Sequence, residues 1–439
     1  PDSTTGITST TITADVTPNA VDVGLDVPGR ELGAFTTSDT TFQITGMDNH
    51  TAANTVTAYA RFSGDTPAYI NVNNAGYTTS ANVKNGDQLR VAMYASNTYS
   101  TTKTVNFLLG PGPHSDEWNV TTRAIDDNPA TPNLGNNLTG KEVRTSANTY
   151  IYSGSSTVLG IDAKVDGTAT AEALTILAEI EGNSAEFQVN GGAWVTSAYV
   201  SLNDTIQARM YPSYNYSTEV STALKLGTLS EDTDIWTITT RAINPNPSSF
   251  SLADATGKEV TSVNYASTTV LGIDAKVDGT ATAAALTILA EIEGNSAEFQ
   301  VNGGAWVTSA YVSLNDTIQA RMYPSYNYST EVSTALKLGT LSEDTDIWTI
   351  TTRAINPNPS SFSLADATGK EVTSVNYAST TVLGIDAKVD GTATAAALTI
   401  LAEIEGLGEF QVNGGAWVTS ADVSLNDIIR VRLYASANY

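Results

Sequence analysis

Carboxylates are the side chains in this chain whose spacing could do chemistry. They gather in two presumed loops that repeat each other, and the clusters are Glu231, Asp232 and Asp234, and Glu343, Asp344 and Asp346. Calcium takes six to eight oxygen ligands, which loop carboxylates and carbonyls can supply, so both clusters are weak calcium candidates. Solubilising charge is the alternative, because no EF-hand spacing is present. No other cofactor is indicated.

Catalytic groups are scarce, and we expect no enzyme activity. The only histidines are His50 and His114, and the chain has no cysteine, so neither a Ser/His/Asp triad nor a zinc site built on histidine or thiolate is expected. Glu179 and Glu181 could be imagined as a glycosidase pair. The same pair recurs twice more on what the alternation indicates is an outward strand face, so a solvated surface is the better interpretation.

Tyrosines form a second candidate site. They cluster in one segment and in its copy, as Tyr211, Tyr214 and Tyr216, and as Tyr323, Tyr326 and Tyr328. A tyrosine ring offers an apolar face and a hydroxyl, which suits stacking on the sugars of surface glycans. The alternative is that these rings cover the end of a domain or the joint with the next one.

An internal repeat organises the elements that would position these groups. Residues 158–247 recur as residues 270–359 with one difference, since Ala284 stands where Glu172 stands, and a third copy begins at Val382. A diverged copy precedes them, in which Trp118 matches Trp236. The repeat predicts four units, residues 17–126, 127–244, 245–356 and 357–439, after a strand-like segment at residues 1–16.

Joints between the units contain paired prolines, at residues 244–247 and 356–359. Proline fixes φ and pushes the residue before it towards extended backbone. The joints should therefore be short and semi-rigid, and the units should form an elongated rod.

Each unit has the pattern of an all-β domain. Leu174, Ile176, Ala178 and Ile180 alternate with polar residues, which is the period of a strand with one buried face. Seven or eight such runs separated by turn signals are typical of an Ig-like β-sandwich. Because Trp236 and Trp348 are in period with apolar neighbours, we expect both in the core.

The repeat resembles the tandem Ig-like repeats of large bacterial surface and adhesin-type proteins. The elements that carry this resemblance include Leu271-Gly272-Ile273, Asn302-Gly303-Gly304-Ala305-Trp306 and Asn315-Asp316-Thr317. The match covers units two to four well and unit one loosely, where Asn73-Asn74-Ala75-Gly76-Tyr77 replaces the Trp-bearing turn. The resemblance implies a spacer, adhesive or fibre-forming role at the cell surface, and it implies no catalytic residues.

Charge and hydropathy exclude some partners. Acidic residues outnumber basic ones by 46 to 21, for a formal charge of −25, so nucleic acid and anionic lipid are not expected to bind. No apolar run approaches the roughly 18 residues of a membrane span.

The last unit ends at Tyr439 without counterparts of residues 329–355, which would form two strands. We expect either that the chain is a window of a longer repeat protein, or that copies join head to tail by strand addition. The leading hypothesis is a structural protein of an extracellular or cell-surface fibre or adhesin stalk. The alternative is a multivalent glycan- or receptor-binding module.

Overall fold

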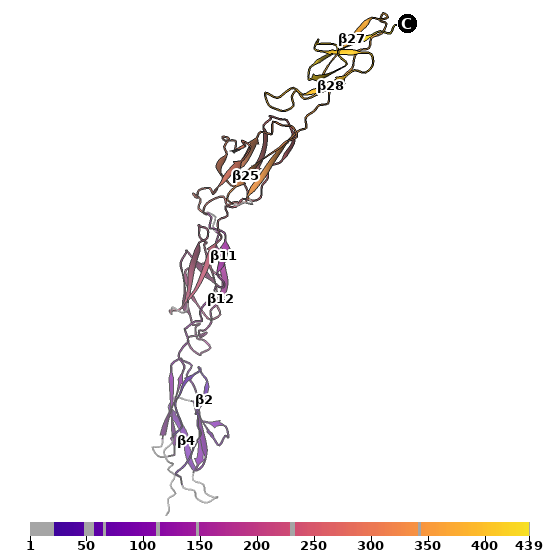
Figure 1. The fold of residues 1–439 in the computed structure, drawn as a ribbon. Helices are drawn as coiled ribbons and strands as arrows, with labels where there is room; N and C mark the ends of the chain where they lie inside the picture. The colour runs from indigo at the N-terminus through magenta and orange to yellow at the C-terminus, as the bar shows by residue number, and fades with distance from the viewer. Residues whose placement is uncertain are drawn as a thin grey trace, which may run out of the picture. The chain divides into compact units, whose positions relative to one another are not determined.

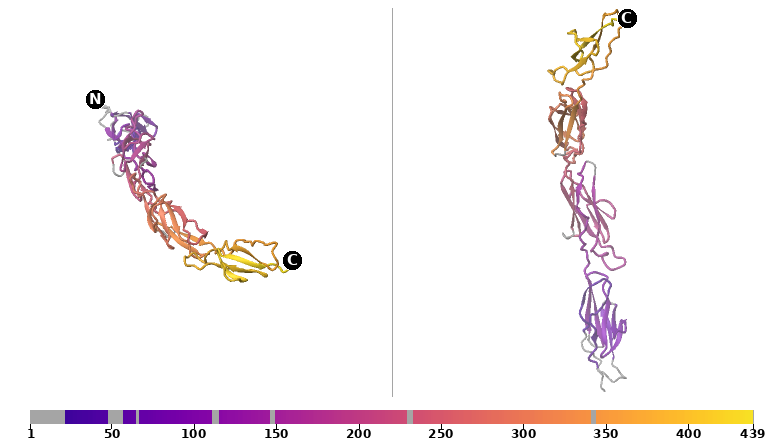
Figure 2. Two further views of the ribbon diagram at one scale, coloured as in Figure 1. Left: turned by 90° about the horizontal axis from the view of Figure 1, so that it is seen from above. Right: turned by 45° about the vertical axis from the view of Figure 1, so that its right-hand side comes forward.

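The computed structural model describes residues 22–47, 57–64, 67–110, 115–145, 149–228, 233–340 and 344–438. These residues form strands and loops and no helix, as the ribbon in Figure 1 and the two further views in Figure 2 show. The expectation of an all-β fold is confirmed. The described part of the chain accordingly has no helix that could span a membrane. The strand-like segment expected at residues 1–16 and both histidines lie outside the described residues.

Buried apolar side chains form four separate clusters in the described residues, and we call the strands around them the first to fourth domains. The chain divides into two compact units. One consists of Pro1–Glu142, Ala147–Ser213 and Thr218–Thr240, and the other of Val143–Ser146, Tyr214–Ser217 and Arg241–Tyr439. Each unit holds two of the clusters. The domain borders given by the repeat stay a prediction.

Two sheets enclose the core of the first domain. Its strands are β1 (Val27–Arg30), β2 (Phe35–Thr37), β3 (Phe42–Gln43), β4 (Thr57–Gly64), β5 (Ala68–Val72), β6 (Tyr77–Thr78), β7 (Ser80–Lys84), β8 (Gln88–Tyr94), β9 (Thr102–Leu109) and β10 (Ser115–Thr122). One sheet has the order β1-β10-β9-β4-β7 and the other β2-β8-β5-β6, with β3 beside β8. The first strand, β1, runs parallel to the last, β10.

The second domain keeps the same plan with fewer strands. They are β11 (Leu138–Lys141), β12 (Ile151–Thr157), β13 (Ile176–Glu181), β14 (Glu186–Val189), β15 (Ser197–Val200), β16 (Thr205–Met210), β17 (Glu219–Leu226) and β18 (Thr233–Thr240). The sheets have the orders β11-β18-β17-β13-β15 and β12-β16-β14. The first and last strands, β11 and β18, again pair in parallel.

The third domain repeats the second strand for strand. Its strands are β19 (Ala255–Lys258), β20 (Asn264–Thr269), β21 (Thr287–Glu293), β22 (Glu298–Val301), β23 (Ser309–Ser313), β24 (Thr317–Met322), β25 (Glu331–Leu338) and β26 (Thr345–Thr352). They form the sheets β19-β26-β25-β21-β23 and β20-β24-β22, and β19 is parallel to β26.

Alternation explains why these segments are strands. In β13 the side chains of Ile176, Ala178 and Ile180 are buried, while those of Glu179 and Glu181 are exposed, so the predicted inward and outward faces are confirmed. The expectation for the two tryptophans is also confirmed, because both are fully buried between the sheets of their domains. Sheet packing without disulfides therefore holds each domain together.

The fourth domain has one complete sheet and one short sheet among the described residues. Its strands are β27 (Val375–Thr381), β28 (Thr399–Glu403), β29 (Glu409–Val412), β30 (Ser420–Ser424) and β31 (Ile428–Tyr434). The sheet β27-β31-β29 matches β20-β24-β22, but β28 pairs only with β30. One face of this domain's core is therefore not covered by a strand of the described chain.

We expect Trp348→Ala to destabilise the third domain by about 3–5 kcal/mol, because it removes the largest side chain of a closed core. Differential scanning calorimetry of the whole chain should show one transition moving to lower temperature. The matched control is Trp306→Ala, at a half-buried position on the outer face of the same domain, which should move it much less. Equal shifts for the two variants would contradict the core role of Trp348.

Candidate functional site at the domain joints

The same three side chains meet at three joints of the chain. An arginine directly after the last strand of a domain binds an aspartate at the start of the next domain, and a tyrosine ring lies against the guanidinium. We call each set a joint latch: Tyr99, Arg123 and Asp162; Tyr216, Arg241 and Asp274; Tyr328, Arg353 and Asp386. The first latch lies within the first compact unit, and the other two lie within the second.

The ion pair of the latch is bidentate. In the first latch, Nη1 and Nη2 of Arg123 donate to the two carboxylate oxygens of Asp162 at 2.7 and 2.6 Å. Nε of the same arginine donates to Glu31 at 3.0 Å, and the guanidinium carbon lies 5.1 Å from the ring centre of Tyr99. Both charges are mostly buried, with 29% and 14% of the Arg123 and Asp162 side chains exposed. Two parallel hydrogen bonds fix the orientation of the partners as well as their distance.

Backbone hydrogen bonds reinforce each ion pair. The N–H of Asp162 donates to the carbonyl of Asp126 at 2.7 Å, and the Asp126 N–H donates back to the Asp162 carboxylate at 2.7 Å. The aspartate thus binds both the arginine and the connecting segment. The later latches have the same pair of bonds, between Asn244 and Asp274 and between Asn356 and Asp386.

A loop of the following domain makes a second contact at each joint. Asp166 accepts a hydrogen bond from the N–H of Thr168 at 2.7 Å, which folds an Asx-turn around Gly167. The N–H of Gly167 then donates to the carbonyl of Asn97 in the first domain at 2.8 Å. The equivalent bonds run from Gly279 to Tyr214 at 2.8 Å and from Gly391 to Tyr326 at 2.7 Å.

Close packing explains why glycine occupies this turn. A Cβ atom on Gly391 would lie 2.9 Å from side-chain carbons of Val260 in the third domain. At Gly279 it would lie 1.8 Å from the carbonyl oxygen of Arg144, which is far inside van der Waals contact. The loop can approach the preceding domain only because this residue has no side chain.

Hydrogen bonds from Arg123 lower the pKa of Asp162 to about 2, and burial raises the pKa of Tyr99. In the other two latches, hydrogen bonds from the arginine likewise lower the pKa of Asp274 and of Asp386. Burial raises the pKa of Tyr216 and of Tyr328. The aspartates therefore stay ionised, and the tyrosines neutral, across the physiological pH range.

The structure places the six candidate tyrosines in different surroundings. Tyr216 and Tyr328 belong to latches, and Tyr214 lies 4.9 Å under the guanidinium of Arg144. Tyr211 is buried and stacks on Tyr150 with ring centres 4.0 Å apart. Of the six, only Tyr323 and Tyr326 are residues that are more than half exposed. The six therefore differ in their surroundings, and a glycan-binding role for them stays a prediction.

The acidic clusters are only partly described, because Glu231, Asp232 and Glu343 lie outside the described residues. Asp234 accepts a hydrogen bond from the N–H of Leu134, and Asp346 one from Leu252, both at 2.7 Å. Asp344 is buried, and its carbonyl accepts a hydrogen bond from Leu338. Across the described ranges, no three His, Asp or Glu residues are grouped closely enough to hold a metal ion.

Sequence reasoning did not find the latch arginines. The available signal was the return of Arg-Ala-Ile after each Trp-bearing strand, at Arg123, Arg241 and Arg353, together with Gly-Ile-Asp at Asp162, Asp274 and Asp386. The arginine and the aspartate recur 33 residues apart in the second and third sets and 39 residues apart in the first, which makes them candidates for a pair. Their contact across a joint nevertheless depends on how consecutive domains meet, which the pattern alone does not give.

The fold and its joints define a tandem array of Ig-like β-sandwiches. No family model and no curated protein matches the sequence. One similar solved structure is an endo-fucoidan hydrolase from glycoside hydrolase family 107, at 13% identity and a TM-score of 0.16, where the match covers 77% of this chain and 44% of that one. A second is surface layer protein SbsC domains 4–9, at 12% identity and a TM-score of 0.19, where the match covers 73% of this chain and 44% of that one. A third is protocadherin gamma B2 extracellular cadherin domains 1–5, at 9% identity and a TM-score of 0.30, where the match covers 96% of this chain and 74% of that one. The chain spans less than half the length of the first two, and these likenesses concern the fold alone.

We expect Arg353→Ala to loosen the joint between the third and fourth domains, raising its open fraction about tenfold, because a partly buried charged pair contributes on the order of 1–2 kcal/mol. The chain has no cysteine, so two exposed positions, Tyr311 and Leu407, can be replaced by cysteine for a pair of fluorescent labels. Single-molecule energy transfer should then give a broader distance distribution.

Arg432→Ala is the matched control for this experiment. Arg432 binds Glu409 inside the fourth domain, so the substitution removes the same charge without touching a joint. A distribution that broadens equally in both variants would mean that the latch does not restrain the joint.

The first latch should also have a characteristic pH dependence. The pKa of Asp162 is lower in the folded than in the unfolded chain, so the stabilisation from the latch is complete above about pH 4 and is lost as the pH falls through about 2. A carboxyl-carbon NMR titration should give a midpoint near 2, which moves towards about 3.9 in Arg123→Ala. An unchanged midpoint in that variant would refute the assigned cause.

Proposed function

We propose that this chain is a non-enzymatic structural protein, a spacer segment of an extracellular or cell-surface fibre or adhesin stalk. The observation that carries the proposal is the recurrence of the same latch at three joints. A protein that only displayed separate domains would need no matched ion pair at every connection, whereas a spacer must limit the bending of each joint.

Each joint combines several restraints in a short segment. The bidentate ion pair, the two backbone hydrogen bonds to the aspartate and the glycine-loop contact act at different points, so they restrict bending in more than one direction. In the second and third latches, paired prolines stiffen the segment that follows the arginine and precedes the aspartate. The net charge of −25 keeps such a chain soluble and discourages lateral association. End-to-end association with copies of itself is part of the same proposal.

The test compares the whole chain with a triple variant, Arg123→Ala, Arg241→Ala and Arg353→Ala. Small-angle scattering should give a smaller maximum dimension and a broader distance distribution for the variant, because flexible joints sample bent arrangements. Electron microscopy of both proteins should show more variable bending in the variant and any end-to-end filaments of the unmodified chain.

The matched control is the triple variant Arg209→Ala, Arg321→Ala and Arg432→Ala. These arginines bind Glu186, Glu298 and Glu409 within single domains, so the charge change is the same and the joints are untouched. Scattering curves that are identical for the latch variant and the unmodified chain would refute the spacer mechanism. Repeating the measurement with calcium and with a chelator tests the acidic clusters, since a calcium-dependent change would support metal binding there.

Multivalent glycan or receptor binding is the second candidate function. It is favoured by a tyrosine and a tryptophan that lie side by side in three successive domains, with ring centres 5.6–5.9 Å apart, as Tyr152 and Trp194, Tyr265 and Trp306, and Tyr377 and Trp417. About half of each tyrosine in these pairs is exposed. A glycan array separates the two functions, because a spacer retains no sugar, whereas a lectin retains one and loses it when the three tyrosines are replaced by alanine.

A further inference from the structure

Three tight turns of the chain place a glycine directly after an asparagine. They follow β14, β22 and β29, at Asn190-Gly191, Asn302-Gly303 and Asn413-Gly414. The asparagines have positive φ angles of 51°, 50° and 47°, and the glycines have φ angles of 73°, 76° and 77°. Two successive residues at positive φ are what a type I′ turn requires, which explains why these two residue types stand here.

This pair of residues is also the one most open to deamidation. The backbone nitrogen of Gly303 gives up its proton and bonds to Cγ of Asn302, the Cγ–Nδ2 bond breaks, and ammonia leaves. Water then opens the cyclic imide and produces aspartate or isoaspartate. Glycine favours the attack because it has no side chain to hinder its nitrogen. All three turns are exposed, so water reaches them.

Two hydrogen bonds hold the asparagine side chain in place. Nδ2 of Asn302 donates to Oδ1 of Asp316 at 2.7 Å, and Oδ1 of Asn302 accepts from the N–H of Thr317 at 2.9 Å. The other oxygen of Asp316 accepts from the N–H of Ser313 at 2.7 Å, so the aspartate is itself fixed. We call this pair of asparagine and aspartate the amide clamp. Because both ends of the amide are bonded, Cγ can reach the nitrogen of Gly303 only after these bonds break.

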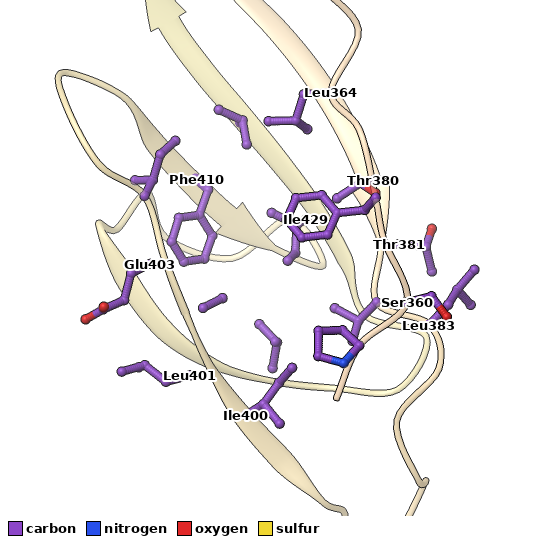
Figure 3. A pocket seen from close by; sticks show the side chains of 17 residues that line it. Ser360, Leu364, Thr380, Thr381, Leu383, Ile400, Leu401, Glu403, Phe410 and Ile429 are labelled. Atoms are coloured by element: carbon purple, nitrogen blue, oxygen red, sulfur yellow. The ribbon is translucent and has the colours of Figure 1, made fainter. Parts of the chain in front are cut away.

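The amide clamp has the same form in the second and fourth domains. Asn190 donates to Asp204 at 2.7 Å and Asn413 donates to Asp427 at 2.6 Å. Each asparagine oxygen accepts from the N–H of the residue after the aspartate at 2.9 Å. In the fourth domain Phe410 of β29 points into the apolar interior, as Figure 3 shows, while the turn that follows this strand is exposed. The same restraint on the amide thus recurs wherever this exposed turn does.

Loss of the amide would remove the clamp. Deamidation puts a carboxylate oxygen in place of Nδ2, which leaves two carboxylates facing each other where a donor faced an acceptor. Isoaspartate also adds a carbon atom to the backbone of the turn, which is closed by a 2.9 Å hydrogen bond from the N–H of Gly304 to the carbonyl of Val301. The turn leads directly to Trp306, the partner of Tyr265, so the reaction takes place beside the aromatic pair.

We propose that these three turns are modification sites, where water converts the asparagine to aspartate or isoaspartate, and that the aspartate of each amide clamp slows this reaction in the folded chain. The clamp, and not the sequence of the turn, then determines how long each turn keeps its amide. This inference concerns single domains and does not rest on the joint latches or on the spacer function.

The experiment incubates the whole chain at mildly alkaline pH and follows each turn by tryptic peptide mapping with mass spectrometry. The peptides that contain Asn190 and Asn302, residues 165–209 and 277–321, can be told apart because Ala284 stands where Glu172 stands. We expect all three asparagines to keep their amides in the folded chain and to lose them rapidly when the chain is unfolded in urea.

Asp316→Ala should speed the loss of the Asn302 amide by at least about tenfold, because it removes a hydrogen bond to a charged group. Asn190 in the same molecule keeps its clamp and should react at its unchanged, slow rate. Glu298→Ala is the matched control, since it removes a carboxylate of the same domain that binds Arg321 and not the amide, and it should leave Asn302 unchanged.

The first domain supplies a control for the glycine. Asn73 donates to Asp87 at 2.8 Å in a turn that also has two residues at positive φ, but the second of them is Asn74. The side chain of Asn74 hinders the attacking nitrogen. Asp87→Ala should therefore leave Asn73 unreacted over the period in which Asp316→Ala converts Asn302.

Equal rates of loss at Asn302 in Asp316→Ala and in the unmodified chain would overturn the proposal. A slower rate in the variant would make Asp316 a catalyst of deamidation and would also overturn it. Sub-denaturing urea tests for unfolding of the variant: a rate that does not change with urea supports a local effect of the clamp, whereas a rate that rises steeply assigns the protection to the whole domain and refutes the clamp. None of these results depends on joint stiffness, so the spacer function is tested separately.

Discussion

In each of the first three domains, closure of the sandwich by its last strand is the constraint on which the rest of the structure depends. That strand buries a tryptophan between the two sheets, pairs in parallel with the first strand of the domain, and continues without a break into the latch arginine. In the third domain Arg353 directly follows Thr352, the last residue of β26. The core therefore positions the joint, and there is no flexible segment between the two.

The latch is tolerant of sequence change around it. The first domain has diverged from the others, and its Trp-bearing turn is replaced, yet Tyr99, Arg123 and Asp162 make the same contacts as their counterparts. Asn97 takes the place of a tyrosine as acceptor for the glycine loop, because only its backbone carbonyl is used. What the joint requires is thus a small set of polar atoms in fixed places, on domains whose remaining surfaces can vary.

The fold could be predicted from the sequence further than the joints could. Alternation along β13 and the period of Trp348 identify strands and core, because both signals are local and have the simple period of a pleated strand. The pairing of Arg353 with Asp386 spans 33 residues and two domains, so it depends on geometry that no local pattern carries. For Tyr216 the residue type was compatible with stacking on a sugar or with packing at a joint. The structure shows that its ring packs against the guanidinium of Arg241.

Parallel pairing of the first and last strands has a mechanical consequence. The chain enters a domain at one end of β19 and leaves it at the other end of β26, so a pull on the flanking segments acts along these strands and across their hydrogen bonds. Bonds loaded in shear share the force and must break together, whereas bonds at the end of a hairpin open one after another. Each of the first three domains is therefore connected so that a pull on its ends loads these hydrogen bonds in shear.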